Sequence, residues 1–179
     1  TREPLDWGMV DRLFAQVCAG VAAAHAFGVV HRDLKPANVL VGNLGGLRVA
    51  KVADFGMVKV FCEGTADSTL TLMNATMGTP GYMAPEQAID ARAVDVRADI
   101  FSLGCVLYRM VCGRPAFVGS QRVLFAKPAA GEYDDPLAVR ADLPERYRRA
   151  IHACLRPDRD HRPPTVGALT TLLELDSVP

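Results

Sequence analysis

The sequence predicts a mainly α-helical fold with one small β-hairpin, and three observations support this. Apolar residues recur at helical spacing over residues 6–27. Two short apolar runs, 39–41 and 48–52, flank a glycine-rich segment, and residues 100–111 are apolar on almost every face. Half of the 179 residues are hydrophobic, which is enough for one sizeable core. We therefore expect a single soluble globular unit.

Local features of the sequence predict each of these elements. Asp6 is a candidate N-cap for the helix over 6–27, whose apolar stripe contains Leu13, Val17, Val21 and Ala24. The runs 39–41 and 48–52 are expected to pair antiparallel through the turn at 42–46. Residues 57–83 lack regular periodicity and are rich in Thr and Ser, which is typical of a long functional loop.

The second half of the chain is expected to be helical. Residues 100–111 suit a helix buried in the middle of a helical lobe, and a short helix is expected over 121–129. Two further helices are expected over 144–155 and 164–175, the last beginning with proline and Thr165.

Composition excludes several classes of partner. Lys plus Arg and Asp plus Glu number 20 each, so net charge gives no reason to expect binding to nucleic acid or anionic membranes. Five scattered cysteines without a CxxC pair indicate reduced thiols in a cytosolic setting. Residues 13–30 carry no Asp, Glu, Lys or Arg, but Gln16, Gly20, His25 and Gly28 interrupt the run, so we expect no membrane helix there.

One segment concentrates polar side chains suited to phosphoryl transfer. Residues 31–38 read His-Arg-Asp-Leu-Lys-Pro-Ala-Asn. Transfer from ATP needs a carboxylate to orient the attacking hydroxyl, a cation beside the phosphate and an oxygen ligand for magnesium, and Asp33, Lys35 and Asn38 can supply these. The Asp-Phe-Gly triplet at 54–56 and the Ala-Pro-Glu triplet at 84–86 follow in order.

Together these motifs make the chain resemble the C-terminal lobe of a eukaryotic-type Ser/Thr protein kinase of the sort also found in bacteria. The resemblance covers nearly all of 1–179, with an activation segment at 54–86. It implies ATP and Mg²⁺ as cofactors, with Asp33 as catalytic base, Lys35 facing the phosphate, and Asn38 and Asp54 as magnesium ligands that, with Lys35, hold the nucleotide.

The resemblance also implies supporting roles. His31 and Phe55 would stack and, with Gly56, couple the two catalytic motifs. Lys35 and the Gly-Thr-Pro-Gly-Tyr segment at 78–82 point to Ser/Thr acceptors in protein substrates, with Thr79 in the catalytic set, hydrogen-bonded near Asp33. The remaining expected structural contacts are an ion pair between Glu86 and Arg162, and a link from Asp99 to the backbone of the 31–38 loop.

Regulation by loop phosphorylation is expected because Arg32 precedes Asp33 and a guanidinium can hold a phosphate. The usual acceptor position of the family falls on Ala75, so Thr71 and Thr76 are the candidates. A second departure is Arg109, where the family usually has a glutamate that meets basic substrate residues; we expect no preference for arginine just upstream of the acceptor.

The largest departure is that no GxGxxG loop and no VAIK-type lysine precede His31. We therefore expect the N-lobe to be missing from this chain, which alone would bind ATP poorly and catalyse little or nothing. The parent protein is expected to be cytoplasmic or to present a cytoplasmic kinase domain from a membrane anchor outside this chain. Two alternatives stay open: a non-catalytic lobe that is a gene remnant or a binding module, and a small-molecule phosphotransferase.

Overall fold

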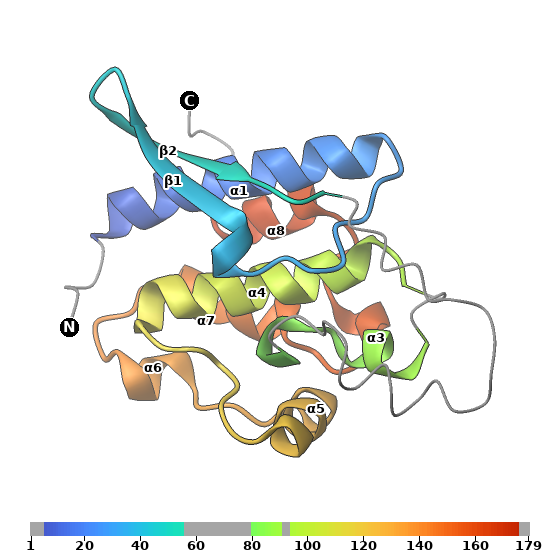
Figure 1. Cartoon of the computed structure of the whole chain (residues 1–179). Coiled ribbons are helices and arrows are strands. Elements are labelled where there is room, and N and C mark those ends of the chain that lie inside the picture. The colour runs from blue at the N-terminus through green and yellow to red at the C-terminus, as the bar shows by residue number, and fades with distance from the viewer. Residues whose placement is uncertain (1–5, 56–79, 91–93, 176–179) are drawn as a thin grey trace.

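The computed structural model describes residues 6–55, 80–90 and 94–175, which form a helical body with one hairpin (Figure 1). In chain order the elements are α1 (Trp7–Ala26), η1 (Pro36–Asn38), β1 (Val39–Leu44), β2 (Leu47–Val52), η2 (Pro80–Tyr82), α3 (Pro85–Ile89), α4 (Val96–Cys112), α5 (Gln121–Ala130), α6 (Pro136–Val139), α7 (Glu145–Cys154), η3 (Arg159–His161) and α8 (Val166–Leu172), where η marks a short 3-10 helix. The mainly helical fold with a small hairpin is as expected.

Helix α1 begins at the predicted cap. The side chain of Asp6 accepts a hydrogen bond of 2.9 Å from the backbone N–H of Met9, which satisfies one of the free donors of the first turn. The helix ends at Ala26, close to the expected end. Its buried stripe packs against α4, α8 and β2, and comprises Val10, Leu13, Phe14, Val17, Cys18 and Val21.

Strands β1 and β2 pair antiparallel, from Val39 opposite Val52 to Leu44 opposite Leu47. The strands are longer than the sequence predicted, because most of the expected turn at 42–46 joins the ladder and only Gly45 and Gly46 lie between the strands. Their φ angles of 57° and 86° suit the two-residue turns that match the twist of a hairpin, a conformation open to glycine.

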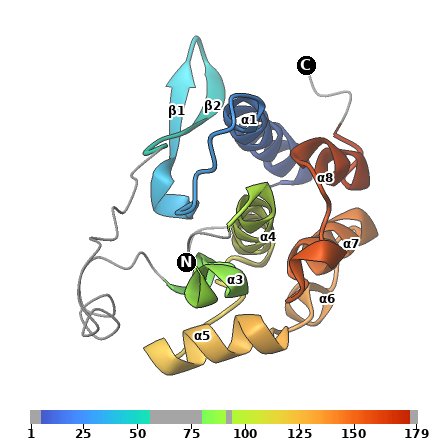
Figure 2. The same cartoon turned by 90° about the vertical axis from the view of Figure 1, so that its right-hand side faces the viewer.

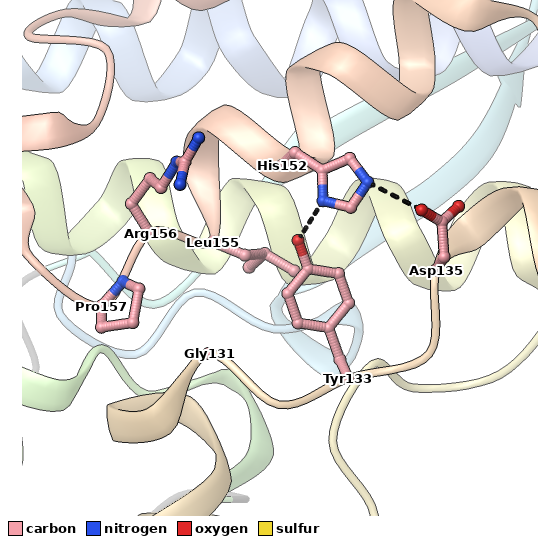
Figure 3. Close-up of a pocket in the computed structure, with 7 residues that line it drawn as sticks. All are labelled: Gly131, Tyr133, Asp135, His152, Leu155, Arg156 and Pro157. Carbon is pink, nitrogen blue, oxygen red and sulfur yellow. Dashed lines mark hydrogen bonds and ion pairs between the residues drawn. The ribbon is translucent and has the colours of Figure 1, made fainter.

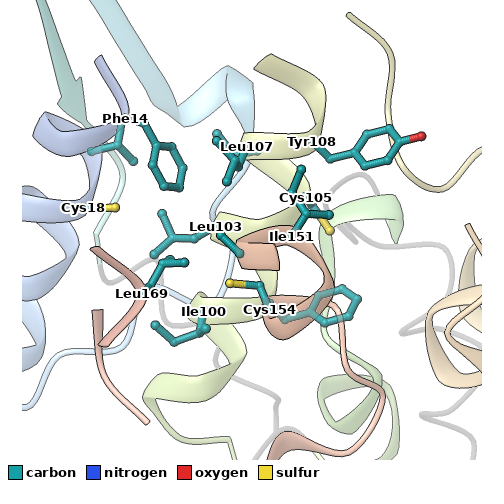
Figure 4. Close-up of a cluster of buried hydrophobic side chains, with 14 of the residues drawn as sticks. Phe14, Cys18, Ile100, Leu103, Cys105, Leu107, Tyr108, Ile151, Cys154 and Leu169 are labelled. Atoms are coloured by element: carbon teal, nitrogen blue, oxygen red, sulfur yellow. The ribbon is translucent and has the colours of Figure 1, made fainter. Parts of the chain in front are cut away.

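Helix α4 lies at the centre of the molecule in both views, between α1 and the shorter helices, with the hairpin and α5 at opposite ends (Figure 2). It spans the expected 100–111 segment and begins earlier, capped by Asp95. Gly104 allows a close approach to α7, since a Cβ atom placed there would lie 2.5 Å from the Cβ of Cys154. The core around this contact is shown in Figure 4.

The remaining helices follow the expected order with shifted ends. Helix α7 falls inside the predicted 144–155 segment. Helix α8 is shorter than predicted: it begins after Thr165, whose side chain caps it by accepting from the N–H of Ala168 at 3.1 Å, and it ends at Leu172. The sequence did not predict α3 or α6. No helix in the described parts of the chain is both long and apolar enough to cross a membrane.

Three of the cysteines are part of the packed core. Cys18, Cys105 and Cys154 are fully buried, and burial raises the pKa of the Cys18 thiol to about 12 and that of Cys105 well above its ordinary value. Cys112 is only partly buried, although its pKa is also raised, to about 11, chiefly by burial. These thiols are therefore protonated packing residues at neutral pH.

Candidate functional site

The loop of residues 31–38 connects α1 to the hairpin and is held by a carboxylate from α4. Asp99 is fully buried, and it accepts hydrogen bonds from the backbone N–H of His31 at 2.8 Å and of Arg32 at 2.9 Å. This is the link between Asp99 and the loop backbone that the sequence predicted. Because the acceptor is a charged carboxylate in a dry environment, it fixes the loop more firmly than a neutral acceptor would.

His25 completes the environment of Asp99. Its Nε2 atom lies 2.8 Å from Oδ2 of Asp99, and its side chain is 11% exposed. Nothing in the sequence indicated that His25 lies beside this loop. The contact joins residues 74 apart in the chain, so no local pattern could have revealed it.

His31 links the loop to the end of β2. Its Nδ1 accepts from the N–H of Asp33 at 3.3 Å, so its Nε2 carries the proton and donates to the carbonyl of Ala53 at 2.9 Å. The ring of His31 lies 4.9 Å from that of Phe55, centre to centre, with the two planes inclined at 58°, so the expected pair is in contact but tilted and not stacked. Gly56 lies outside the described residues.

Three polar side chains of the loop converge. The ammonium of Lys35 donates to Oδ2 of Asp33 at 2.9 Å, and Nδ2 of Asn38 donates to the backbone carbonyl of Asp33 at 2.8 Å. Pro36 starts the short helix η1 and Asn38 ends it, which turns Asn38 back toward Asp33. The carboxylate of Asp33 is one third exposed, so an external hydroxyl can reach it.

Asn38 and Asp54 are brought together by the hairpin. The N–H of Ala53 donates to the carbonyl of Asn38 at 2.9 Å, which extends the ladder by one step, and Asp54 follows directly with a φ of 61°. Since Nδ2 of Asn38 is engaged with Asp33, its Oδ1 remains as an acceptor. Amide and carboxylate oxygens of this kind suit Mg²⁺, which takes few protein ligands and completes its shell with water and phosphate.

The described residues contain no cluster of three or more His, Cys, Asp or Glu side chains arranged to hold a metal. A magnesium site built from Asn38 and Asp54 needs no such cluster, because one of its ligands is an amide and others come from the nucleotide. Asn38 and Asp54 therefore offer oxygen donors of the type that Mg²⁺ takes, on backbone segments that the hairpin brings side by side.

A bidentate ion pair anchors α3 to the C-terminal part of the chain. The guanidinium of Arg162 donates to the two carboxylate oxygens of Glu86 at 2.7 and 2.8 Å, and also to the carbonyls of Arg156, Arg97 and Pro157. The expected pairing is therefore present. The side chain of Arg162 is fully buried, so removing Glu86 would leave an unpaired buried charge at a cost of about 3–5 kcal/mol.

Arg32 and Arg109 occupy different surroundings. Arg32 is exposed and has a φ of 64°, a conformation that costs a non-glycine residue roughly 1–3 kcal/mol.

Arg109 is exposed in the last turn of α4, and its guanidinium donates to the carbonyl of Gly113, the C-cap of that helix. Arg109 therefore reaches from the end of the helix toward water. Thr71, Thr76 and Thr79 lie outside the described residues.

Gln87 is a second residue that the sequence did not single out. Its Nε2 donates to the carbonyl of Arg32 at 2.8 Å, and its Oε1 accepts from the N–H of Ala84 at 3.1 Å. The residue immediately follows the Ala-Pro-Glu motif, but the 55 residues that separate it from Arg32 conceal the contact.

A separate pocket of about 340 Å³ lies between α5 and α7, lined by Gly131, Tyr133, Asp135, His152, Leu155, Arg156 and Pro157 (Figure 3). His152 sits between Tyr133 and Asp135, with distances of 2.7 Å to the phenol oxygen and 3.2 Å to a carboxylate oxygen. A bidentate hydrogen bond from Arg148 lowers the pKa of Asp135 to about 2, and burial raises that of Tyr133.

Comparison with known proteins gives a consistent result. The family model described as "Protein kinase domain" matches residues 2–172. The chain is 40% identical over 153 residues to the DNA damage-responsive serine/threonine-protein kinase RqkA of Deinococcus radiodurans, and 36% identical over 161 residues to the probable serine/threonine-protein kinase PknB of Bifidobacterium longum. These alignments cover 84% and 87% of this chain and 22% of each relative.

The serine/threonine-protein kinase pkn2 of Myxococcus xanthus is 34% identical over 176 residues, or 97% of this chain and 21% of that protein. The chain thus spans about a fifth of the length of these curated relatives. The match of the family model over most of the sequence, together with the geometry of the 31–38 loop, shows that this chain belongs to the protein kinase domain family.

Proposed function

We propose that this chain carries the catalytic-loop side of a Ser/Thr protein kinase, which transfers the γ-phosphate of ATP to hydroxyl groups of protein substrates. The observation that carries the proposal is the convergence at Asp33, where the ammonium of Lys35 meets the carboxylate and the amide of Asn38 meets the carbonyl. Relatives named as Ser/Thr kinases support it.

Each residue has a defined task in this proposal. The carboxylate of Asp33 accepts a hydrogen bond from the substrate hydroxyl and takes its proton as the oxygen attacks the γ-phosphorus. The ammonium of Lys35, held 2.9 Å from that carboxylate, places positive charge beside the transferred group. Oδ1 of Asn38 and the carboxylate of Asp54 would hold Mg²⁺, which neutralises charge on the phosphates when bound.

The supporting contacts explain how this arrangement can be preorganised. Asp99 holds the backbone before Asp33, and His31 holds the end of β2 beside it. The loop thus needs little rearrangement on binding substrate, which is the main way that a protein accelerates phosphoryl transfer. We propose in addition that Thr79 and one of Thr71 and Thr76 serve the acceptor site and its control, as the family resemblance implies.

We also propose that residues 1–179 supply only one side of the nucleotide site. They contain no glycine-rich loop and no partner lysine ahead of His31, so these residues alone are expected to bind Mg-ATP weakly. Protein substrates, and a cytoplasmic location for the domain, complete the proposal. The odd number of scattered cysteines supports that location.

The test is phosphate transfer from labelled Mg-ATP to a generic Ser/Thr protein substrate, measured for the 179-residue chain and for the protein extended through its upstream reading frame. The extended protein should label Ser and Thr, and Asp33→Asn should lower the rate by about a hundredfold or more. Asp142→Asn is the matched control, because that carboxylate is 68% exposed and pairs only at the surface with Arg140.

Three results would contradict the proposal. Equal rates for the wild type and Asp33→Asn would show that this carboxylate is not the base. Transfer to a small-molecule hydroxyl but not to protein would favour the small-molecule phosphotransferase. No transfer by the extended protein would favour a non-catalytic binding lobe.

A further inference from the structure

A side chain from α3 reaches across to the loop that carries Asp33. Gln87 donates through Nε2 to the carbonyl of Arg32 at 2.8 Å and accepts at Oε1 from the N–H of Ala84 at 3.1 Å. Both contacts are satisfied by one orientation of the amide, since the reversed group would place donor against donor and acceptor against acceptor. The direction of the amide is therefore defined by its neighbours.

The carbonyl that Gln87 binds belongs to the peptide group directly before Asp33, so this hydrogen bond acts on the backbone that carries the carboxylate. The C=O of Arg32 and the N–H of Asp33 belong to the same planar peptide group. On one edge this group accepts from Gln87, and on the other it donates to Nδ1 of His31 at 3.3 Å. The peptide plane that leads directly into Asp33 is thus fixed at both edges by side chains.

Arg32 itself requires such support. Its φ of 64° is unfavourable for a residue with a side chain, so the surrounding contacts must hold it. The N–H of Arg32 donates to Asp99 on α4 at 2.9 Å, and its carbonyl accepts from Gln87 on α3. The two peptide groups that flank Arg32 are therefore held by two different helices.

Helix α3, which carries Gln87, is itself held in place by other contacts. Glu86, the neighbour of Gln87, forms the bidentate ion pair with the buried Arg162. Gln87 also braces the backbone N–H of Ala84, the N-cap residue of α3. A shift of α3 would therefore move the donor away from Arg32.

We propose that Gln87 is a positioning residue for Asp33: it couples the position of α3, at the end of the Ala-Pro-Glu motif, to the orientation of the peptide group that precedes the catalytic carboxylate. The inference rests on the proposed kinase function. On this proposal, the position of α3 relative to the 31–38 loop affects the rate of phosphate transfer separately from the binding of nucleotide.

Two substitutions of Gln87 and one control at another glutamine separate the possible roles of Gln87. Gln87→Glu keeps an acceptor for the N–H of Ala84 and replaces the donor to Arg32 with a carboxylate oxygen. Gln87→Met removes both contacts at similar volume. Gln16→Glu is the matched control, because Oε1 of Gln16 accepts from the N–H of Ala50 at 2.7 Å and a glutamate retains that acceptor.

The experiment measures kcat and KM for the protein extended through its upstream reading frame. At pH 8 Gln87→Glu should lower kcat about tenfold or more while KM for ATP changes by less than about twofold, because the carboxylate repels the carbonyl of Arg32 and disturbs the approach of Asp33. Gln16→Glu should match the wild type. A kcat for Gln87→Glu within about twofold of the wild type would overturn the proposal.

A pH profile distinguishes positioning from a general structural effect. A protonated glutamate at position 87 again has a donor for Arg32, so the ratio of the variant kcat to the wild-type kcat should rise as pH falls from 8 toward 5. The same ratio for Gln87→Met should stay flat, because methionine does not titrate. A flat ratio for Gln87→Glu would refute the role of the donor.

A measurement that does not depend on activity tests the role of Gln87 if the proposed kinase function fails. If the wild-type protein transfers no phosphate, the kinase proposal fails and the backbone amide resonance of Asp33 becomes the test. Gln87→Glu should then shift that resonance and Gln16→Glu should not. An unchanged Asp33 resonance in Gln87→Glu would overturn the positioning role independently of activity.

Discussion

Replacing Asp99 by asparagine tests how the 31–38 loop is held. In the wild type, Oδ1 of Asp99 accepts from Arg32 and Oδ2 accepts from both His31 and His25. An asparagine has the same shape but offers one oxygen and one NH₂ group. In its better orientation the oxygen faces His31 and His25, and the NH₂ group faces the N–H of Arg32.

The expected cost follows from these three bonds. The N–H of Arg32 loses its acceptor, at about 1–2 kcal/mol for a partly buried donor, and the two bonds that remain lose the charge on their acceptor, at up to about 1 kcal/mol each. The sum is about 1–4 kcal/mol, a substantial share of the roughly 5–15 kcal/mol that stabilises a typical domain. The loop should also lose its fixed geometry, so kcat should fall.

Urea unfolding at 25 °C measures this directly. Asp99→Asn should lower the midpoint with an unchanged slope, because the folded and unfolded surfaces stay the same. Asp142→Asn, on an exposed ion pair, should change the free energy of unfolding by less than about 0.5 kcal/mol. The substitution His25→Ala should cost less in the Asp99→Asn background than in the wild type. An Asp99→Asn protein within about 0.5 kcal/mol of the wild type would refute the reasoning.

Two further predictions concern packing and pH. Gly104→Ala should destabilise the fold by about 1–3 kcal/mol, because the new Cβ would lie 2.5 Å from the Cβ of Cys154; an unchanged Tm in thermal unfolding would show that α4 and α7 separate freely. The hydrogen bonds from Arg148 lower the pKa of Asp135 to about 2 from its ordinary 3.8, so their stabilisation is present above pH 4 and is lost as pH falls through 2. Because Asp135 is 36% exposed, solvent screening limits this to about 1 kcal/mol, and Asp135→Asn should flatten the stability profile between pH 4 and 2.

The candidate residues of the loop could be named from the sequence because their signals are local. Asp33, Lys35 and Asn38 lie within six residues, and proline at 36 helps to set the turn that joins them. The hairpin follows from two apolar runs and a glycine turn, although its strands extend further than propensity suggested because Gly42 and Asn43 join the ladder. Helix α1 was equally clear, since its cap and stripe lie within one segment.

The sequence by itself therefore determined the mainly helical fold with its hairpin, the resemblance to protein kinases, and the residues whose chemistry suits phosphoryl transfer. Tertiary structure alone decided that His25 meets Asp99 and that Gln87 meets Arg32, across 74 and 55 residues. Periodicity and motif spacing report the state of the backbone over a few turns. Contacts between distant side chains depend instead on how the helices cross and how closely they pack, as at Gly104, and no local pattern encodes that.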